Sequence, residues 1–273
     1  MNLEIKVSLI ISVYKKIELL DLIFEALKKQ TFRDFEVIIS DDGSGSDMED
    51  FVNLKSKELS FPVKHIFHED NGFRKNKILN KSIVNSSGEY LIFLDGDCIP
   101  HNEFIKEHFI NRKDNTALCG RRVMLGKSIS EKVLHERKIS FSPLNLFFDS
   151  AFGGKNKTRY ADDSIYLRNK IFRKIISRQK TNLTGCNFSL HKNTILKING
   201  FDENYTGAGI GEDSDIEFRL KLSGAGFMSV KNLAIIYHIF HEQTKANIAN
   251  IEYFDNVKSS GNFICKNGIE KFI

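Results

Sequence analysis

GEYLIFLDGD, at residues 88–97, carries the strongest fold signal in the chain. Its apolar run, Tyr90 to Leu94, is unbroken by polar residues and stops abruptly at Asp95, Gly96 and Asp97. Such a run is typical of a central strand that is covered on both faces. The two aspartates would then lie at the carboxyl end of that strand, where open α/β sheets bind ligands. The stretch therefore predicts an α/β fold with a binding site at this edge of its sheet.

The chain before this stretch alternates apolar strands with amphipathic helices. Strands are predicted at residues 7–13, 35–40 and 63–67, and helices at residues 17–27 and 75–84, where apolar residues recur at helical spacing. Repeated units of this kind imply a mostly parallel, doubly wound sheet with right-handed crossovers. We therefore expect a central sheet flanked by helices.

The pattern changes after residue 126. Residues 127–180 are basic, rich in Asn and Ser and without clear periodicity, so we predict an insertion or a mobile lid there, ending at about residue 182. Beyond it we expect strands at residues 185–190 and 234–237 and helices at 193–198 and 212–223. No domain linker is visible, and we predict a single domain.

Composition excludes several classes of protein. With 40 basic and 35 acidic residues the net charge is +5, an excess that suits anionic lipid or phosphate-bearing substrates but falls short of a nucleic-acid signature. No apolar run approaches the roughly 18 residues of a membrane span, and no signal peptide is apparent, so we expect a cytoplasmic protein. The four cysteines lie far apart without a C-x-x-C pair, which indicates reduced, buried thiols.

Acidic residues follow two of the predicted strands. Asp95 and Asp97 are hard oxygen donors of the kind that hold Mg²⁺ or Mn²⁺ together with substrate phosphates, and Gly96 would let a diphosphate come close. Asp42 follows the second strand at the same edge, where a carboxylate can accept a hydrogen bond from a nucleobase imide. Each group has a plainer alternative. The first fits a solvated Asp-Gly turn equally well, and the second fits a helix N-cap, which the local sequence favours.

A third acidic group opens the helix predicted at residues 212–223. Four carboxylates fall within six positions there, namely Glu212, Asp213, Asp215 and Glu217. Mutual repulsion raises the pKa of a carboxylate, as a general base requires, so Glu212 and Asp213 are candidate catalytic residues. The alternative is ordinary capping, since acidic residues are common in a first helical turn.

Histidine and basic residues complete the candidates. His238 follows the last predicted strand, and a neutral imidazole there could complete a metal site with the carboxylates. His241 need not point the same way, and His65 and His68, which have the same spacing, are assigned no role. Arg74, Lys75 and Lys77 stand at the start of a predicted helix, where the solvated alternative is favoured over a phosphate contact.

A series of ordered motifs resembles family 2 glycosyltransferases, whose nucleotide-diphospho-sugar transferase fold is called GT-A. VSLIISVYKK, EVIISDDGS and GEYLIFLDGD resemble the family's strands, the last one carrying its D-x-D motif, and NGFRKNKILNKSI resembles a segment of a bacterial subgroup. TGCNFSL, NGFDENYTGAGIGEDSDIEFRL and IIYHIFH resemble the carboxyl-terminal half of galactosyl- and N-acetylgalactosaminyltransferases, including chondroitin polymerase domains. The resemblance covers roughly residues 5–126 and 183–242.

The resemblance implies a role for each candidate. Asp42 would bind the uracil, Asp95 the ribose or the metal, and Asp97 the metal. Asp213 would be the catalytic base, His238 would complete the metal site, and Arg74 would assist near the donor. Val13 would also contact the donor, although Val13-Tyr14-Lys15 departs from the Pro-x-Tyr-Asn of many members.

The resemblance also implies an activity. It is that of an inverting hexosyltransferase that uses Mn²⁺ or Mg²⁺ and a UDP-sugar such as UDP-Gal, UDP-GalNAc or UDP-Glc. The acceptor would be a saccharide or a lipid-linked saccharide in bacterial surface polysaccharide synthesis, with peripheral docking at the inner face of the membrane left open. Residues 1–126 would bind the nucleotide sugar, residues 183–245 would bind the acceptor and carry catalysis, and residues 246–273 would form a C-terminal segment.

Two other activities fit part of the pattern. A magnesium-dependent phosphohydrolase also places a D-x-D turn after a strand, but it does not need a base near residue 213. A sugar-nucleotide-binding protein without turnover would not need Asp97, Asp213 and His238 together. A dinucleotide oxidoreductase is disfavoured because no G-x-G-x-x-G follows the first strand.

Overall fold

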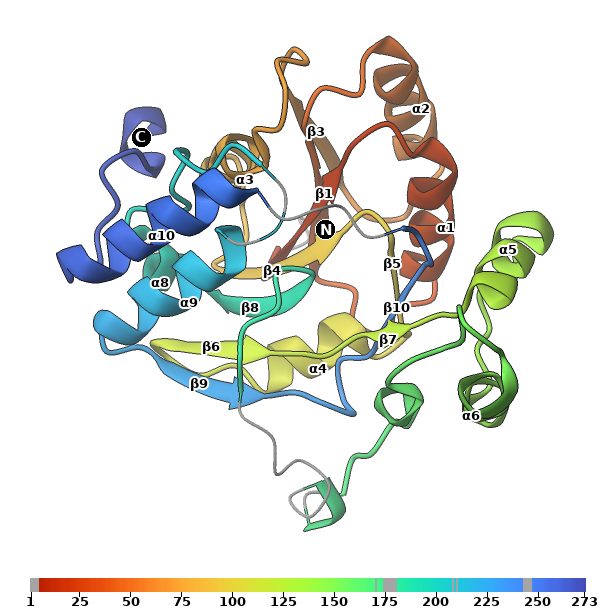
Figure 1. The fold of residues 1–273 in the computed structure, drawn as a ribbon. Coiled ribbons are helices and arrows are strands. Elements are labelled where there is room, and N and C mark those ends of the chain that lie inside the picture. The colour runs from red at the N-terminus through yellow and green to blue at the C-terminus, as the bar shows by residue number, and fades with distance from the viewer. Residues whose placement is uncertain (1–4, 170, 174–180, 208, 210, 243–246) are drawn as a thin grey trace.

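The computed structural model describes residues 5–169, 171–173, 181–207, 209, 211–242 and 247–273. Its centre is a seven-stranded sheet in the order β3-β2-β1-β4-β8-β6-β9 (Figure 1). The strands are β1 (Val7–Val13), β2 (Phe35–Asp41), β3 (Val63–Phe67), β4 (Tyr90–Asp95), β6 (Thr116–Cys119), β8 (Asn187–His191) and β9 (Gly226–Ser229). Strands β1 to β4 are parallel, and β8 runs antiparallel to both of its neighbours, β4 and β6. The predicted mostly parallel, doubly wound sheet is confirmed.

Helices cover both faces of this sheet. The described helices outside residues 127–180 are α1 (Ile17–Leu27), α2 (Ser46–Ser56), α3 (Lys75–Val84), α4 (Phe104–Ile110), α8 (Lys192–Leu196), α9 (Glu212–Leu222) and α10 (Ile248–Ser260), with 3₁₀ turns η1 (Ala161–Ser164) and η2 (Ile269–Phe272). In β4, Ile92 and Leu94 join one hydrophobic cluster, whereas Leu91 and Phe93 join another on the opposite face. The unbroken apolar run of β4 thus reflects burial on two sides, as predicted.

A second, three-stranded sheet joins segments from far apart in the chain. It consists of β5 (Cys98–Pro100), β10 (Ile236–His238) and β7 (Val123–Met124), with β10 in the middle. The last strand was predicted at residues 234–237, which begins two positions and ends one position too early, so His238 lies within the strand and not after it. The elements β5, β6, β7, β9 and α4 were not predicted, because elements of two to seven residues are too short to show a period. The longer helix α10 was not predicted either.

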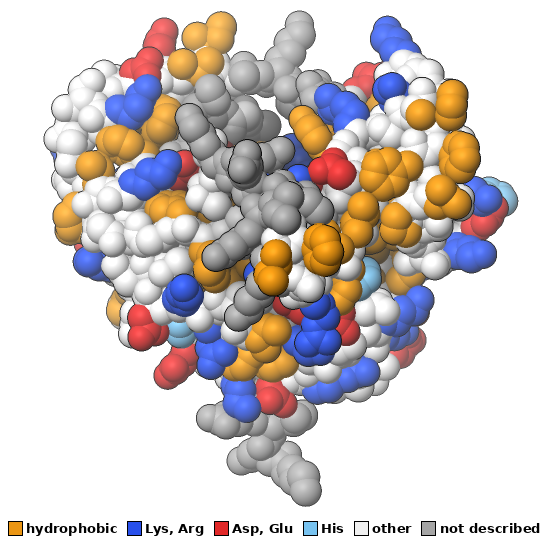
Figure 2. All heavy atoms as spheres, turned by 90° about the horizontal axis from the view of Figure 1, so that it is seen from below, with side chains coloured by type: hydrophobic (Ala, Val, Ile, Leu, Met, Phe, Trp, Pro, Cys, Tyr) orange, Lys and Arg blue, Asp and Glu red, His pale blue; other side chains and the backbone are white. Residues whose placement is uncertain are grey.

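Residues 127–180 contain more regular structure than predicted. Helices α5 (Lys127–Glu136) and α6 (Pro143–Phe152) lie beside each other at one side of the molecule (Figure 1). No helix had been assigned to this part from the sequence, which shows no clear periodicity there. Figure 2 shows hydrophobic side chains gathered on that side of the surface. The helix α6 escaped notice because most of its apolar residues point outward, opposite to the usual pattern.

All four cysteines are buried and unpaired, as predicted. Among the described residues, no helix has both the length and the apolar character needed to cross a bilayer.

A buried polar network beneath the sheet leads to a prediction about the pH dependence of stability. His108 on α4 is fully buried, with Nδ1 2.7 Å from Ser189 Oγ and Nε2 3.0 Å from Asn187 Oδ1. Burial lowers the pKa of His108 to about 4, against the upward effect of the Asn187 hydrogen bond. Because the folded pKa lies below that of the unfolded chain, about 6.5, stability should be lost as the pH falls from about 6.5 towards 4.

The measurement is the free energy of unfolding in urea at pH 7 and pH 4.5 for the wild type and for His108→Gln. The wild type should lose about 2 to 3 kcal/mol more than the variant over this interval, since glutamine cannot be protonated there. Equal losses in the two proteins would contradict the buried neutral imidazole.

Candidate active site

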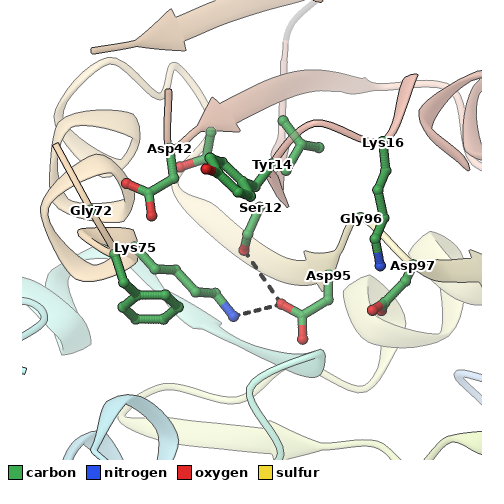
Figure 3. Close-up of a pocket in the computed structure, with 12 residues that line it drawn as sticks. Ser12, Tyr14, Lys16, Asp42, Gly72, Lys75, Asp95, Gly96 and Asp97 are labelled. Atoms are coloured by element: carbon green, nitrogen blue, oxygen red, sulfur yellow. Dashed lines mark hydrogen bonds and ion pairs between the residues drawn. The ribbon is translucent and has the colours of Figure 1, made fainter. Parts of the chain in front are cut away.

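A cavity of about 370 Å³ opens at the carboxyl ends of β1, β2 and β4 (Figure 3). This is the edge at which the sequence predicted the site. Asp42 and Asp97 lie at opposite ends of the group of side chains, and Asp95 and Lys75 lie between them (Figure 3). The described residues that line the cavity are Ser12, Val13, Tyr14, Lys16, Ser40, Asp42, Gly72, Phe73, Lys75, Asp95, Gly96 and Asp97.

Asp42 is held in place by its neighbours and keeps free hydrogen-bonding capacity. Its Oδ1 lies 2.7 Å from His68 Nε2, and its Oδ2 accepts a hydrogen bond from the backbone N–H of Arg74 at 2.9 Å. A carboxylate has about four lone-pair sites, so acceptor capacity remains on Asp42. His68, to which the sequence analysis assigned no role, therefore positions a residue of the cavity wall. The sequence spacing of His68 gave no sign of this.

Asp95 and Gly96 are fitted closely against β1. Asp95 Oδ1 accepts hydrogen bonds from Lys75 Nζ at 2.7 Å and from Ser12 Oγ at 3.4 Å. The backbone N–H of Gly96 donates to the Ser12 carbonyl at 2.8 Å. A Cβ at residue 96 would lie 2.7 Å from that carbonyl oxygen, so only glycine lets the turn approach β1 this closely. This packing is a reason for Gly96 beyond the one that the sequence suggested.

Lys75 joins two segments that are far apart in the chain. Its Nζ donates to Asp95 and also to Glu212 Oε1 at 2.6 Å, so one ammonium group bridges the end of β4 and the first turn of α9. Burial raises the pKa of Glu212, and the nearby charges of Asp95 and Asp213 add to this against the opposing effect of Lys75. From the sequence a solvated Lys75 was favoured, because nothing in the neighbouring residues distinguishes Lys75 from Arg74 and Lys77 as the one that points inward.

The four carboxylates of α9 separate into two pairs. Asp215 is buried and bonded to Arg219, and Glu217 accepts from the backbone N–H of Leu183 at 2.7 Å, so both serve the fold. Glu212 is engaged by Lys75. Asp213 accepts from the backbone N–H groups of Ser214 at 2.7 Å and Gly185 at 3.4 Å, and it forms no ion pair with another described residue.

Asp97 lies between two imidazole rings. The antiparallel pairing of β10 with β5 sets His238 opposite Cys98, next to Asp97. His238 Nε2 is 3.5 Å from Asp97 Oδ1, and His241 Nε2 is 3.3 Å from Asp97 Oδ2. Burial raises the pKa of Asp97, but the His241 hydrogen bond and the charges of both rings outweigh it, so the pKa lies well below its ordinary value. His241 therefore shares the site with His238, which its spacing did not reveal.

A second cavity, of about 670 Å³, shares Asp95 and Asp97 with the first. His238 and His241 line it, together with the cationic side chains of Arg122, Lys155, Lys157 and Arg159. A space that adjoins the Asp97 site on the side away from Asp42 is thus bordered by positive charge. Lys155, Lys157 and Arg159 could not be connected with the site from the sequence, because they lie in the segment predicted as an insertion. Arg122 precedes that segment and was not singled out either.

Arg74 and Val13 occupy different positions relative to the first cavity. Arg74 is not among its described lining residues, because its guanidinium turns back to the carbonyl of Glu69. Lys75 takes the inward position that was expected for Arg74. Val13 lines the cavity, and its carbonyl accepts from the backbone N–H of Asp42 at 3.1 Å, which holds the ends of β1 and β2 together.

The sequence matches two family models. The model described as "Glycosyl transferase family 2" matches residues 8–176, and the one described as "N-terminal domain of galactosyltransferase" matches residues 173–242. Chondroitin synthase of Escherichia coli is 26% identical over 242 residues, covering 85% of this chain and 34% of that protein. The chain thus spans about a third of the length of this relative.

Solved structures share the fold. A mannosyltransferase from Pyrobaculum calidifontis, in complex with GDP-Man and Mn²⁺, superimposes with a TM-score of 0.58 at 13% identity, covering 87% of this chain and 58% of that one. S. aureus TarS 1-349 in complex with UDP-GlcNAc gives a TM-score of 0.55 at 18% identity, covering 89% and 62%. These neighbours are GT-A glycosyltransferases, so the expected GT-A fold is confirmed. The first family model matches more than half of the residues of this chain. The chain therefore belongs to glycosyl transferase family 2, the nucleotide-sugar-dependent glycosyltransferases.

Proposed function

We propose that the chain is an inverting, metal-dependent hexosyltransferase that moves a sugar from a UDP-sugar to a saccharide hydroxyl. UDP-Gal, UDP-GalNAc and UDP-Glc are the candidate donors. A free or lipid-linked saccharide in bacterial surface polysaccharide synthesis is the proposed acceptor. The observation that carries the proposal is the convergence on one sheet edge of Asp42, Asp95 and Asp97 with Lys75 and Glu212, across two adjoining cavities.

The residues around Asp97 fit a divalent cation. Ligand atoms of Asp97, Cys98 and His238 lie within 4.8 Å of one another, and the buried Nδ1 of His238 has no hydrogen-bond partner among the described residues. A carboxylate with an imidazole suits Mn²⁺ better than Mg²⁺, which prefers oxygen alone, whereas a thiol suits neither ion. We therefore assign the metal to Asp97 and His238, with Mn²⁺ as the preferred ion.

Each side chain then has a task that its contacts support. The remaining acceptor capacity of Asp42 receives the uracil imide N–H, and the free Oδ2 of Asp95 receives a ribose hydroxyl. Lys75 keeps Asp95 and the start of α9 in register. Asp213 takes the proton of the acceptor hydroxyl during attack. When bound, the cation would act as a Lewis acid that offsets the charge of the departing diphosphate.

Attack from the face opposite the leaving group inverts the anomeric carbon. An α-linked donor therefore yields a β-linked product, and NMR of the isolated product tests this directly. The phosphohydrolase alternative is not favoured, because the chain belongs to a transferase family.

The donor class is tested by thermal shift with UDP-, GDP- and dTDP-sugars, each with Mn²⁺ or with EDTA. A ligand at about 100 times its dissociation constant adds about 2.7 kcal/mol, which should raise the melting temperature by roughly 5 °C or more for a chain of this size. We expect such a rise with a UDP-sugar and Mn²⁺, and a smaller rise with EDTA. A rise with GDP- or dTDP-sugars alone would overturn the uracil assignment.

A transfer assay separates binding from turnover. Release of UDP from the stabilising donor should require Mn²⁺ and should increase when a saccharide acceptor is added. Donor binding with no release of UDP under any of these conditions would contradict transferase activity and favour a binding protein without turnover.

A further inference from the structure

Helix α6 presents its apolar side to solvent. Leu144, Phe147, Phe148 and Phe152 are 65%, 41%, 57% and 80% exposed. Residues spaced three, four and eight positions apart lie on one side of a helix, so these four form a single apolar stripe. Leu146, on the opposite side, is the buried residue of the helix. The amphipathic character of α6 is therefore reversed relative to an ordinary surface helix.

Specific contacts hold α6 in this orientation. Leu146 packs in a hydrophobic cluster with Val133 of α5. Asp149 Oδ2 accepts hydrogen bonds from the backbone N–H of Thr158 at 2.7 Å and from its hydroxyl at 2.6 Å. The rings of Phe148 and Phe152 stack with their centroids 6.3 Å apart. The outward position of the aromatic rings is thus set by the fold.

The neighbouring helix shows that this exposure is particular to α6. The exposed side of α5 carries oppositely charged pairs four residues apart, Lys127 with Glu131 and Lys132 with Glu136, each at 3.9 Å. Such pairs are typical of a helix that faces water. Helix α6 has no ion pair of this kind among its described residues, so its outer side is suited to a different environment.

Positive charge borders the apolar stripe. Residues 137–160 include five basic residues and one acidic residue, and the acidic one, Asp149, is bonded to Thr158. Lys155 and Lys157 are exposed, and neither makes an ion pair with another described residue. Hydrophobic and basic side chains accordingly lie next to one another on this side of the surface (Figure 2). Exposed Phe and Leu flanked by lysines characterise helices that lie in the interface of an anionic bilayer.

We propose that α6 docks on an anionic lipid surface, with Phe147, Phe148 and Phe152 entering the acyl boundary and Lys155 and Lys157 contacting lipid phosphates. Residues 155–157 also line the second cavity with Asp97, so docking brings the opening of the active site close to the lipid surface. Acceptors held in that surface would then reach the site without leaving it.

Co-sedimentation with lipid vesicles tests the docking. The whole chain is mixed with vesicles of phosphatidylcholine containing 30% phosphatidylglycerol, or of phosphatidylcholine alone, at about 0.1 M salt. Binding is expected with the anionic vesicles. The double variant Phe148→Ser/Phe152→Ser should bind at least about tenfold more weakly, and so should Lys155→Gln/Lys157→Gln. Leu54→Ser, at a 60% exposed position on α2, is the matched control and should bind as the wild type does.

Fluorescence tests the depth of insertion. The chain contains no tryptophan, so Phe148→Trp creates a single reporter on α6 and Leu54→Trp a control on α2. Emission of the first should shift to the blue with anionic vesicles and be quenched by brominated acyl chains, whereas that of the second should not change. Neither readout depends on catalysis, so failure of the docking is distinguishable from failure of the proposed function.

The proposal would be overturned if the wild type did not bind anionic vesicles. It would also be overturned if the Phe148→Ser/Phe152→Ser variant bound as well as the wild type, or if the emission of the reporter at residue 148 showed that it stays in water. Light scattering would show whether a second copy of the chain covers the apolar stripe instead of lipid. A concentration-dependent dimer that is lost in the Phe148→Ser/Phe152→Ser variant, together with no vesicle binding, would assign the stripe to a second copy of the chain.

Discussion

Replacing Asp97 with asparagine is expected to lower the rate of sugar transfer by about a thousandfold or more. The substitution keeps the shape of the side chain but removes the negative charge that lies between His238 and His241. A bound divalent cation supplies several kcal/mol of charge stabilisation, and each 1.4 kcal/mol corresponds to a factor of ten in rate. The measurement is kcat for UDP release with saturating Mn²⁺, accompanied by calorimetric titration of Mn²⁺.

The controls for this variant use the same chemical change elsewhere. Asp114→Asn alters a fully exposed side chain at the amino end of β6 and should leave kcat within about threefold. His238→Gln should reproduce most of the loss, whereas His241→Gln should lose less, because His241 is not in the group whose ligand atoms converge within 4.8 Å. Full activity of Asp97→Asn with unchanged Mn²⁺ affinity would refute the assignment.

Replacing Asp213 with asparagine should lower kcat by about 10²- to 10⁴-fold with little change in the KM for the donor. Asp213 is anchored by backbone N–H groups of Ser214 and Gly185 and pairs with no cation among the described residues, so its carboxylate is available to accept a proton. Glu212 is the adjacent carboxylate, but Lys75 engages it. Steady-state kinetics of acceptor transfer at pH 7 make the measurement.

The matched variant Glu212→Gln separates the two carboxylates. It should raise the KM for the donor more than it lowers kcat, because the substitution removes the negative charge of one of the two partners of Lys75 and so weakens the bridge that holds Lys75 beside Asp95. If Glu212→Gln instead lost kcat as severely as Asp213→Asn, at constant donor KM, Glu212 would be the base.

The sequence predicted best where burial dominates. The run from Tyr90 to Leu94 has to be a strand covered on both faces, and the position of Asp95 and Asp97 at its carboxyl end follows from that alone. Parallel pairing of β1 with β2 and β4 then brings Asp42 to the same edge. These features rest on hydrophobic periodicity, which a single sequence displays directly.

The inward-pointing polar residues could not be predicted in this way. Lys75, His68 and His241 acquire their contacts from segments that are distant in sequence, and nothing in their immediate neighbours records those contacts. The helix α6, within residues 127–180, was not predicted for a related reason. This helix exposes its apolar stripe, so its apolar residues do not mark the side that packs against the core.

The order of the central sheet has a consequence for exchanging parts between relatives. The two family models meet at residues 173–176, which suggests a natural place to cut and recombine. Strand β8 comes from beyond that point, yet it is inserted between β4 and β6, which come from before it. A chimera joined there would replace β8, a middle strand of the sheet. It would also replace β10, the strand that contains His238. Successful shuffling would therefore need partners whose β4 and β6 tolerate the same antiparallel neighbour, whatever sugar each parent transfers.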